Sequence, residues 1–220
     1  MERMRRGLRS GLIAVVGVAT LAIPSAACTT PSGTPAPSAP SAPPSAAPPV
    51  VPGCEQGCQE TFSAALDGGR RLEALHRGAG NVLAYWDGAR LLDSAPVLGT
   101  DGRPYETATG GLCARGACSV TFEYGVHSAA VAAIRLDAKI TVTATVEGVV
   151  ADAHDLDGDG VPDAAIRQST YEPSFATAPL YWVTYLRQGD RLVPTGCTAP
   201  VQGQVPAPAA PATGACPGTI

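Results

Sequence analysis

A stretch of proline, serine and alanine limits the part of this 220-residue chain that can fold. Residues 29–53 carry no charge and almost no large apolar side chain, so they cannot bury a hydrophobic core. Proline-rich chain of this kind favours extended polyproline II, at about 3.1 Å per residue. We therefore predict a disordered tether over residues 28–53, a globular domain over residues 54–200 and a Pro/Ala-rich tail over residues 201–220.

The residues before the tether have the three parts of a secretory signal peptide. The first nine residues hold four arginines, the apolar run Leu12–Ile23 follows, and small residues precede Cys28. The apolar run is short for a hydrocarbon core about 30 Å thick, so it does not predict a membrane-spanning helix. We expect residues 1–27 to be removed on export.

The sequence Ser25-Ala26-Ala27-Cys28 resembles the bacterial lipobox, in which the cysteine is lipidated and becomes the mature N-terminus. This resemblance implies lipidation of Cys28 and a protein anchored to the cell membrane on its extracytoplasmic side. Ser25 stands where the lipobox usually has leucine. An ordinary signal peptide, cut near Ala27 to leave a free Cys28, is the alternative interpretation.

Export would leave an acidic domain. Removing residues 1–27 takes four arginines and one glutamate from the 15 basic and 19 acidic residues, which leaves a net charge of −7. Such a domain has no general electrostatic attraction to nucleic acid or to anionic lipid. We expect the membrane as a partner through the lipid anchor, an unidentified envelope or extracellular partner, and no nucleic acid.

The cysteine count predicts three disulfide bonds. Six cysteines remain besides Cys28, an even number suited to an oxidising compartment: Cys54, Cys58, Cys113, Cys118, Cys197 and Cys216. The short glycine-containing loop between Cys113 and Cys118 favours a local bridge. Cys54 and Cys58 are four residues apart. On a helix their Cβ atoms would be about 5–6 Å apart, too far for the roughly 3.5–4.5 Å that a disulfide needs. We therefore expect these two cysteines to pair with Cys197 and Cys216. A tetrahedral zinc site is the alternative, although the spacings lack the tight pairs of common zinc knuckles.

The apolar pattern of the domain predicts one helix followed by a sheet. Apolar residues at near-helical spacing predict a helix over Gln59–Arg77. Farther along, Ile140–Glu147 alternates apolar and polar residues as a half-buried strand does. Asp87-Gly88 and Gln188–Asp190 lie between strand-like runs and predict hairpin turns. The expected fold is α+β, with one N-terminal helix and a mainly antiparallel β-sheet stapled by disulfides.

One motif carries recognisable chemistry. Around Gly160, which permits a sharp turn, four aspartates occupy positions 1, 3, 5 and 9 of a loop: Asp155, Asp157, Asp159 and Asp163. Carboxylates this close repel one another unless a cation lies between them. Ca²⁺ takes six to eight oxygen ligands at about 2.3–2.6 Å, and the carbonyl of Val161 would add a fifth protein ligand.

The segment Ala153–Ile166 looks like the calcium loop shared by EF-hands, dockerins and FG-GAP or VCBS repeats. It is most similar to the FG-GAP/VCBS type, because Ile166 replaces the acid at position 12 and the preceding Val142–Val150 is strand-like. The resemblance implies a Ca²⁺ site. Because position 12 lacks a bidentate acid, we expect a weak dissociation constant of about 10⁻⁴–10⁻³ M, and therefore a structural role rather than a sensor role. The resemblance implies neither a propeller fold nor adhesion. A surface turn without a metal is the alternative.

These features together predict an extracytoplasmic, lipid-anchored, calcium-binding module with a binding or envelope-structural role. The alternative is a secreted hydrolytic enzyme whose active site is assembled from residues distant in sequence. No Gly-x-Ser-x-Gly nucleophile motif accompanies His76, His127 and His154, so we identify no catalytic residue. A pocket with convergent titratable groups would favour the enzyme.

Overall fold

The computed structural model describes residues 49–78 and 80–218. They belong to the second of two compact units, residues 46–220. The expected signal peptide, Cys28 and residues 29–48 of the expected tether lie outside the described residues. Within residues 49–78 and 80–218, no helix is both long and apolar enough to cross a membrane.

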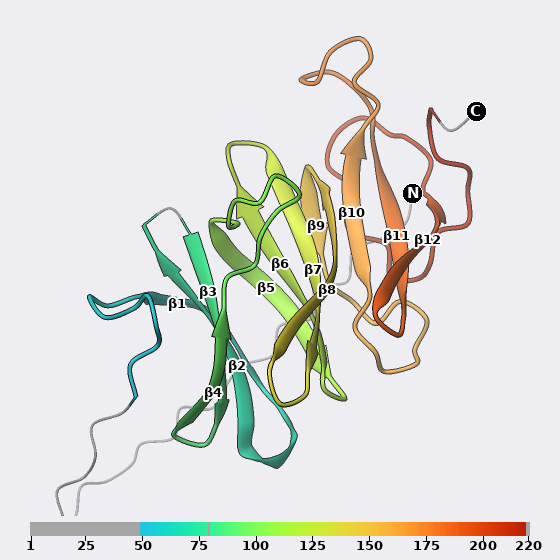
Figure 1. Cartoon of the computed structure of the whole chain (residues 1–220). Helices are drawn as coiled ribbons and strands as arrows, with labels where there is room; N and C mark the ends of the chain where they lie inside the picture. Colours follow the sequence, from blue (N-terminus) through green and yellow to red (C-terminus); the bar gives the residue numbers. More distant parts are fainter. Residues whose placement is uncertain (1–48, 79, 219–220) are drawn as a thin grey trace, which may run out of the picture. The chain divides into compact units, whose positions relative to one another are not determined.

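The described fold consists of three four-stranded antiparallel sheets, each a meander of consecutive strands (Figure 1). The first sheet contains β1 (Gln59–Ala65), β2 (Arg70–Arg77), β3 (Gly80–Asp87) and β4 (Arg90–Ala95). The second contains β5 (Thr107–Ala114), β6 (Ala117–Tyr124), β7 (Ser128–Leu136) and β8 (Ile140–Gly148). The third contains β9 (Val150–Asp152), β10 (Ala164–Ser169), β11 (Leu180–Gln188) and β12 (Arg191–Cys197).

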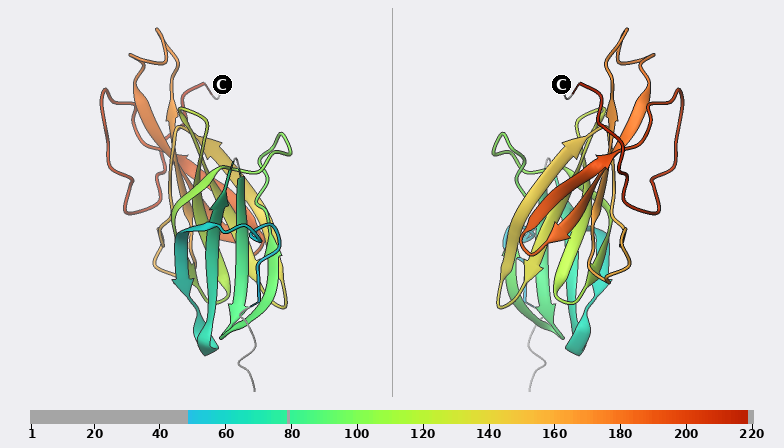
Figure 2. Two further views of the ribbon diagram at one scale, coloured as in Figure 1. Left: turned by 90° about the vertical axis from the view of Figure 1, so that its left-hand side faces the viewer. Right: turned by 90° about the vertical axis from the view of Figure 1, so that its right-hand side faces the viewer.

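The β5–β8 sheet is covered on both faces, and β7 shows why. Ala130, Ala132 and Ile134 belong to the core shared with β2 and β3, whereas Val131 packs with Ile166 of β10. Successive side chains of a strand point to opposite faces, so an uninterrupted apolar run suits a strand buried on both sides. Figure 1 shows the β1–β4 strands on one side of the central sheet and the β9–β12 strands on the other, and Figure 2 views the molecule from each of these two sides.

The predicted N-terminal helix is wrong, and with it the α+β class: the described chain is almost entirely β. The segment Gln59–Arg77 forms β1, a short 3₁₀ turn and β2. Gly68 and Gly69 have φ values of 71° and 76°, which turn the chain into a hairpin. Leu72 and Leu75 are three residues apart, as on a helix face, yet they lie in different clusters on opposite faces of β2. Apolar residues on both faces of the strand together give a spacing that resembles that of a helix.

The predicted pairing of Cys54 and Cys58 with Cys197 and Cys216 is also wrong. Cys54 and Cys58 bond to each other across a Cα–Cα distance of 5.3 Å, well within the range of disulfides. The prediction assumed helical spacing, but Gly57, with φ 94°, places the two cysteines in a tight turn. Because the chain reverses there, the two Cβ atoms approach more closely than on a helix.

The other two bridges hold a hairpin and the tail. The predicted local pair Cys113–Cys118 is confirmed and joins directly opposed residues of β5 and β6. Cys197 of β12 bonds to Cys216, and its amide donates to the carbonyl of Gly214 at 2.9 Å. The last part of the Pro/Ala-rich tail is therefore fixed to the third sheet.

Candidate metal site

The aspartate loop connects β9 to β10, two antiparallel neighbours in the third sheet. Its base is closed by the Asp163 amide, which donates to the carbonyl of His154 at 2.6 Å. A second buried contact anchors the loop to the central sheet, where the Ser119 hydroxyl of β6 donates to the Pro162 carbonyl at 2.9 Å. The loop is thus a fixed connection between two strands.

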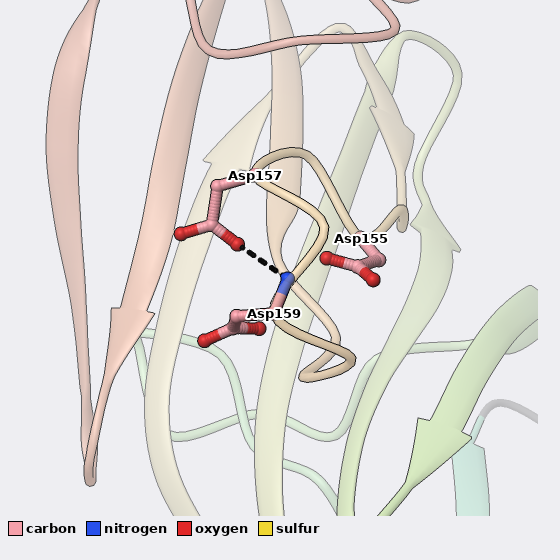
Figure 3. A group of neighbouring side chains, drawn as sticks. All are labelled: Asp155, Asp157 and Asp159. Atoms are coloured by element: carbon pink, nitrogen blue, oxygen red, sulfur yellow. Dashed lines mark hydrogen bonds between the residues drawn. The ribbon is translucent and has the colours of Figure 1, made fainter.

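Three of the four aspartates come together in this loop. One carboxylate oxygen from each of Asp155, Asp157 and Asp159 lies within 4.8 Å of the other two, so the three could hold a metal ion (Figure 3). Asp157 and Asp159 are exposed. Alternate positions along the chain converge because the backbone curls between them.

Backbone amides hold these carboxylates in place. Asp155 accepts hydrogen bonds from Gly158 and Gly160, both at 2.9 Å. Asp157 and Asp159 each accept from the amide two residues farther on, at 3.1 and 2.7 Å. Both glycines have φ 79°, a conformation that other residues rarely adopt. The amides leave lone pairs on the carboxylate oxygens, so the triad keeps its capacity to bind a cation.

Asp163 plays a different part in the structure. Its side chain is buried, at 2% exposure, and its two oxygens accept from the amides of Leu156 at 2.9 Å and Arg187 at 2.7 Å. Burial raises the pKa of Asp163, the two hydrogen bonds oppose that rise, and the charges of Asp157 and Asp159 add to it. Asp163 therefore ties the loop to β11. Metal ligation by Asp163 and by the Val161 carbonyl stays a prediction.

Arg115 is a neighbour of the loop that sequence reasoning missed. A Cβ atom added to Gly160 would lie 3.0 Å from a terminal nitrogen of the Arg115 guanidinium. Arg115 occupies the tip of the loop closed by the Cys113–Cys118 disulfide, with φ 52°. Two motifs that are far apart in sequence thus meet, and a positive charge lies beside the aspartates.

A cavity of about 880 Å³ adjoins this contact and is lined by Asp159, Val161 and several charged side chains. Arg135 pairs there with Asp137 at 2.8 Å and also with Asp190. The buried Arg187 side chain also lines it and donates to carbonyls of β6 and β7 at 2.9 Å. These two arginines are therefore paired with carboxylates or with backbone carbonyls, and these contacts join the second and third sheets.

The three histidines lie in separate surroundings. Nδ1 of His76 is 2.8 Å from the Glu106 carbonyl oxygen, and Nε2 of His154 is 3.1 Å from the Asp152 carboxylate. The ring of His127 packs against Phe175 at 5.4 Å between centroids.

Comparison of the chain with protein-family models, with characterised proteins and with solved structures gives no match.

Proposed function

We propose that this protein is an extracytoplasmic calcium-binding module with a structural role, held at the membrane by a lipid on Cys28. The observation that carries the calcium site is the triad Asp155, Asp157 and Asp159, whose oxygens lie within 4.8 Å of one another. Two unit charges at that separation repel by about 1 kcal/mol in water and by more near a protein surface. A divalent cation removes this repulsion.

The donor set favours calcium over other metals. The triad offers only hard carboxylate oxygens, whereas zinc and copper sites use imidazole or thiolate ligands. Mg²⁺ requires a tight octahedron at about 2.0–2.1 Å and gives up water reluctantly, while Ca²⁺ accepts a looser shell. An exposed three-carboxylate loop completed by water suits the millimolar calcium outside cells.

The structural role follows from what the loop connects. The same loop reaches β11 through Asp163 and β6 through the Pro162 carbonyl. Calcium that orders the triad would also order these two attachments, and so stabilise the contact between the third sheet and the central sheet. The gain is about 1.4–2.7 kcal/mol in 10 mM calcium for a dissociation constant of about 10⁻⁴–10⁻³ M.

Thermal unfolding with and without calcium tests this proposal. We expect 10 mM calcium to raise the melting temperature by roughly 3–10 °C over chelator, given about 2–4 °C per kcal/mol for a domain of this size. Asp157→Ala should abolish the rise. The control Glu60→Ala removes an exposed carboxylate of β1 and should keep the rise. Equal melting temperatures of the wild type in calcium and in chelator would contradict a structural calcium site.

The membrane anchor rests on the sequence pattern and on the disulfides, which are typical of oxidising compartments. Cys28→Ser should release the protein from the membrane fraction or leave the signal peptide uncleaved. Normal processing with unchanged membrane retention would refute lipidation. The anchor and the calcium site are tested by separate variants, so either proposal can fail alone.

A further inference from the structure

The strongest unexplained feature outside the aspartate loop is Arg167 of β10. Its Nε atom is buried and has no hydrogen-bond partner in residues 49–78 and 80–218. The guanidinium carbon lies 6.0 Å from the centroid of the Trp182 ring, at the edge of cation–π range. Within the same residues, no carboxylate forms a salt bridge with Arg167. The guanidinium is a cation with five N–H donors, so without a carboxylate partner it calls for an anionic acceptor.

Two hollows meet at this side chain. One has a volume of about 340 Å³, and the other, of about 250 Å³, shares His127, Val149 and Arg167 with it. The larger hollow is within the size range of small-molecule sites. Among the described residues that line it there is no aspartate or glutamate. The acidic residue that lines the smaller hollow, Glu123, is exposed and beyond salt-bridge distance of Arg167.

Two segments supply walls of the larger hollow, whose lining combines apolar side chains with glutamines. The connection from β10 to β11 supplies Phe175, and the tail supplies residues 202–204. The side-chain amide of Gln202 donates to the Thr177 carbonyl at 3.0 Å, which joins the two walls. The connection is also closed at its base, where the Thr170 amide donates to the Pro179 carbonyl at 3.0 Å. The hollow is therefore bounded by linked segments on both sides.

The aromatic side chains near the entrance form a chain of contacts. The Phe175 ring lies 5.4 Å from His127 and 5.8 Å from Tyr171, measured between ring centroids. Phe175 is 39% exposed and Tyr171 is 59% exposed, and of these three rings His127 and Phe175 line the hollow.

We propose that this hollow binds a small organic carboxylate with an apolar body. The terminal N–H groups of Arg167 take the carboxylate, because their planar fork matches two carboxylate oxygens. Val149, Phe175 and Leu180 pack against the apolar part. A single arginine without a second fixed cation suits a singly charged group. This site is separate from the aspartate loop and does not depend on the calcium proposal.

Nuclear magnetic resonance of the full-length protein tests the site with benzoate as the probe and neutral benzamide as its isostere. We expect benzoate to shift the Arg167 Nε–H resonance in a saturable manner, and benzamide to bind at least about tenfold more weakly. Arg167→Gln should weaken benzoate binding by a similar factor, and Arg167→Lys should restore part of it. The control Arg191→Gln, an exposed arginine of β12, should leave binding unchanged.

Phe175→Ala provides a second variant in case Arg167→Gln does not fold. It changes a half-exposed loop residue, and we expect it to weaken benzoate binding several-fold. Equal binding of benzoate and benzamide, or no benzoate shift at Arg167, would overturn the proposal. Tighter binding of inorganic phosphate than of benzoate would overturn the assignment to carboxylates.

Discussion

Replacing Asp163 by alanine separates the structural contacts of the aspartate loop from its metal chemistry. The carboxylate of Asp163 is buried at 2% exposure and accepts the amides of Leu156 and Arg187. Removing it leaves two amide donors without their acceptor, and each unsatisfied buried donor costs about 1–3 kcal/mol. Part of that loss is offset, because the variant no longer buries a charge near Asp157 and Asp159. We therefore expect a net loss of about 2–4 kcal/mol in unfolding free energy.

Urea unfolding in chelator, with the disulfides intact, measures this loss without any contribution from calcium. Asp163→Ala should lower the melting temperature by roughly 4–16 °C in a parallel thermal scan. The matched control is Asp157→Ala, which removes an exposed carboxylate from the same loop. In chelator this control should be as stable as the wild type or slightly more stable, because relief of the repulsion offsets the loss of one exposed hydrogen bond from the Asp159 amide. If both variants unfold at the same urea concentration, the buried contacts of Asp163 do not stabilise the loop.

Three further predictions concern the rest of the molecule. Burial alone would raise the pKa of Glu147, but hydrogen bonds from Tyr105, Thr100 and others lower it below its usual value. Glu147→Gln should therefore be less stable than the wild type at pH 7. Urea titrations should find that this difference vanishes as the pH falls through the lowered pKa. Leu72→Ala should cost about 2–5 kcal/mol in urea unfolding, because this side chain is fully buried between the first and second sheets; a loss below 1 kcal/mol would contradict that packing. Replacing Cys197 and Cys216 together by serine should cost about 3 kcal/mol, since the bridge closes a loop between cysteines 19 residues apart, and unchanged unfolding under non-reducing conditions would refute this.

The sequence predicted a strand with alternating polar residues and a hairpin with a clear turn signal. The alternation over Ile140–Glu147 corresponds to β8, and the hairpin expected at Asp87-Gly88 joins β3 to β4. The central strand β7 gave no such signal. It is buried on both sides, and its run of alanine, valine and isoleucine carries no alternation. Periodicity therefore found β8, in which apolar and polar residues alternate, and missed β7, which is buried on both sides.

The helix error has a related cause. Between Phe62 and Leu75 the apolar residues belong to two strands and to both faces of β2, so their combined spacing imitates a helix. The pair Gly68-Gly69 was the correct signal, because adjacent glycines favour a turn. The incorrect cysteine pairing followed from the same helix.

The candidate site was predictable where its residues are close in sequence. The triad of Asp155, Asp157 and Asp159 follows from spacing around one glycine, since local backbone curvature alone brings them together. The approach of Arg115 to Gly160 depends on how two sheets pack, which no local pattern encodes. The same holds for Arg167, whose surroundings come from four separate segments.

The central claim is that the aspartate loop binds calcium, and a calcium titration followed by amide resonances tests it most directly. The amides of Gly158 and Gly160 donate to Asp155, so they report on any ion that engages its carboxylate. We expect both resonances to shift with a single saturable midpoint at about 0.1–1 mM Ca²⁺, and with a much higher midpoint for Mg²⁺. Resonances that stay unchanged up to about 10 mM calcium would show that the loop is a turn without a metal.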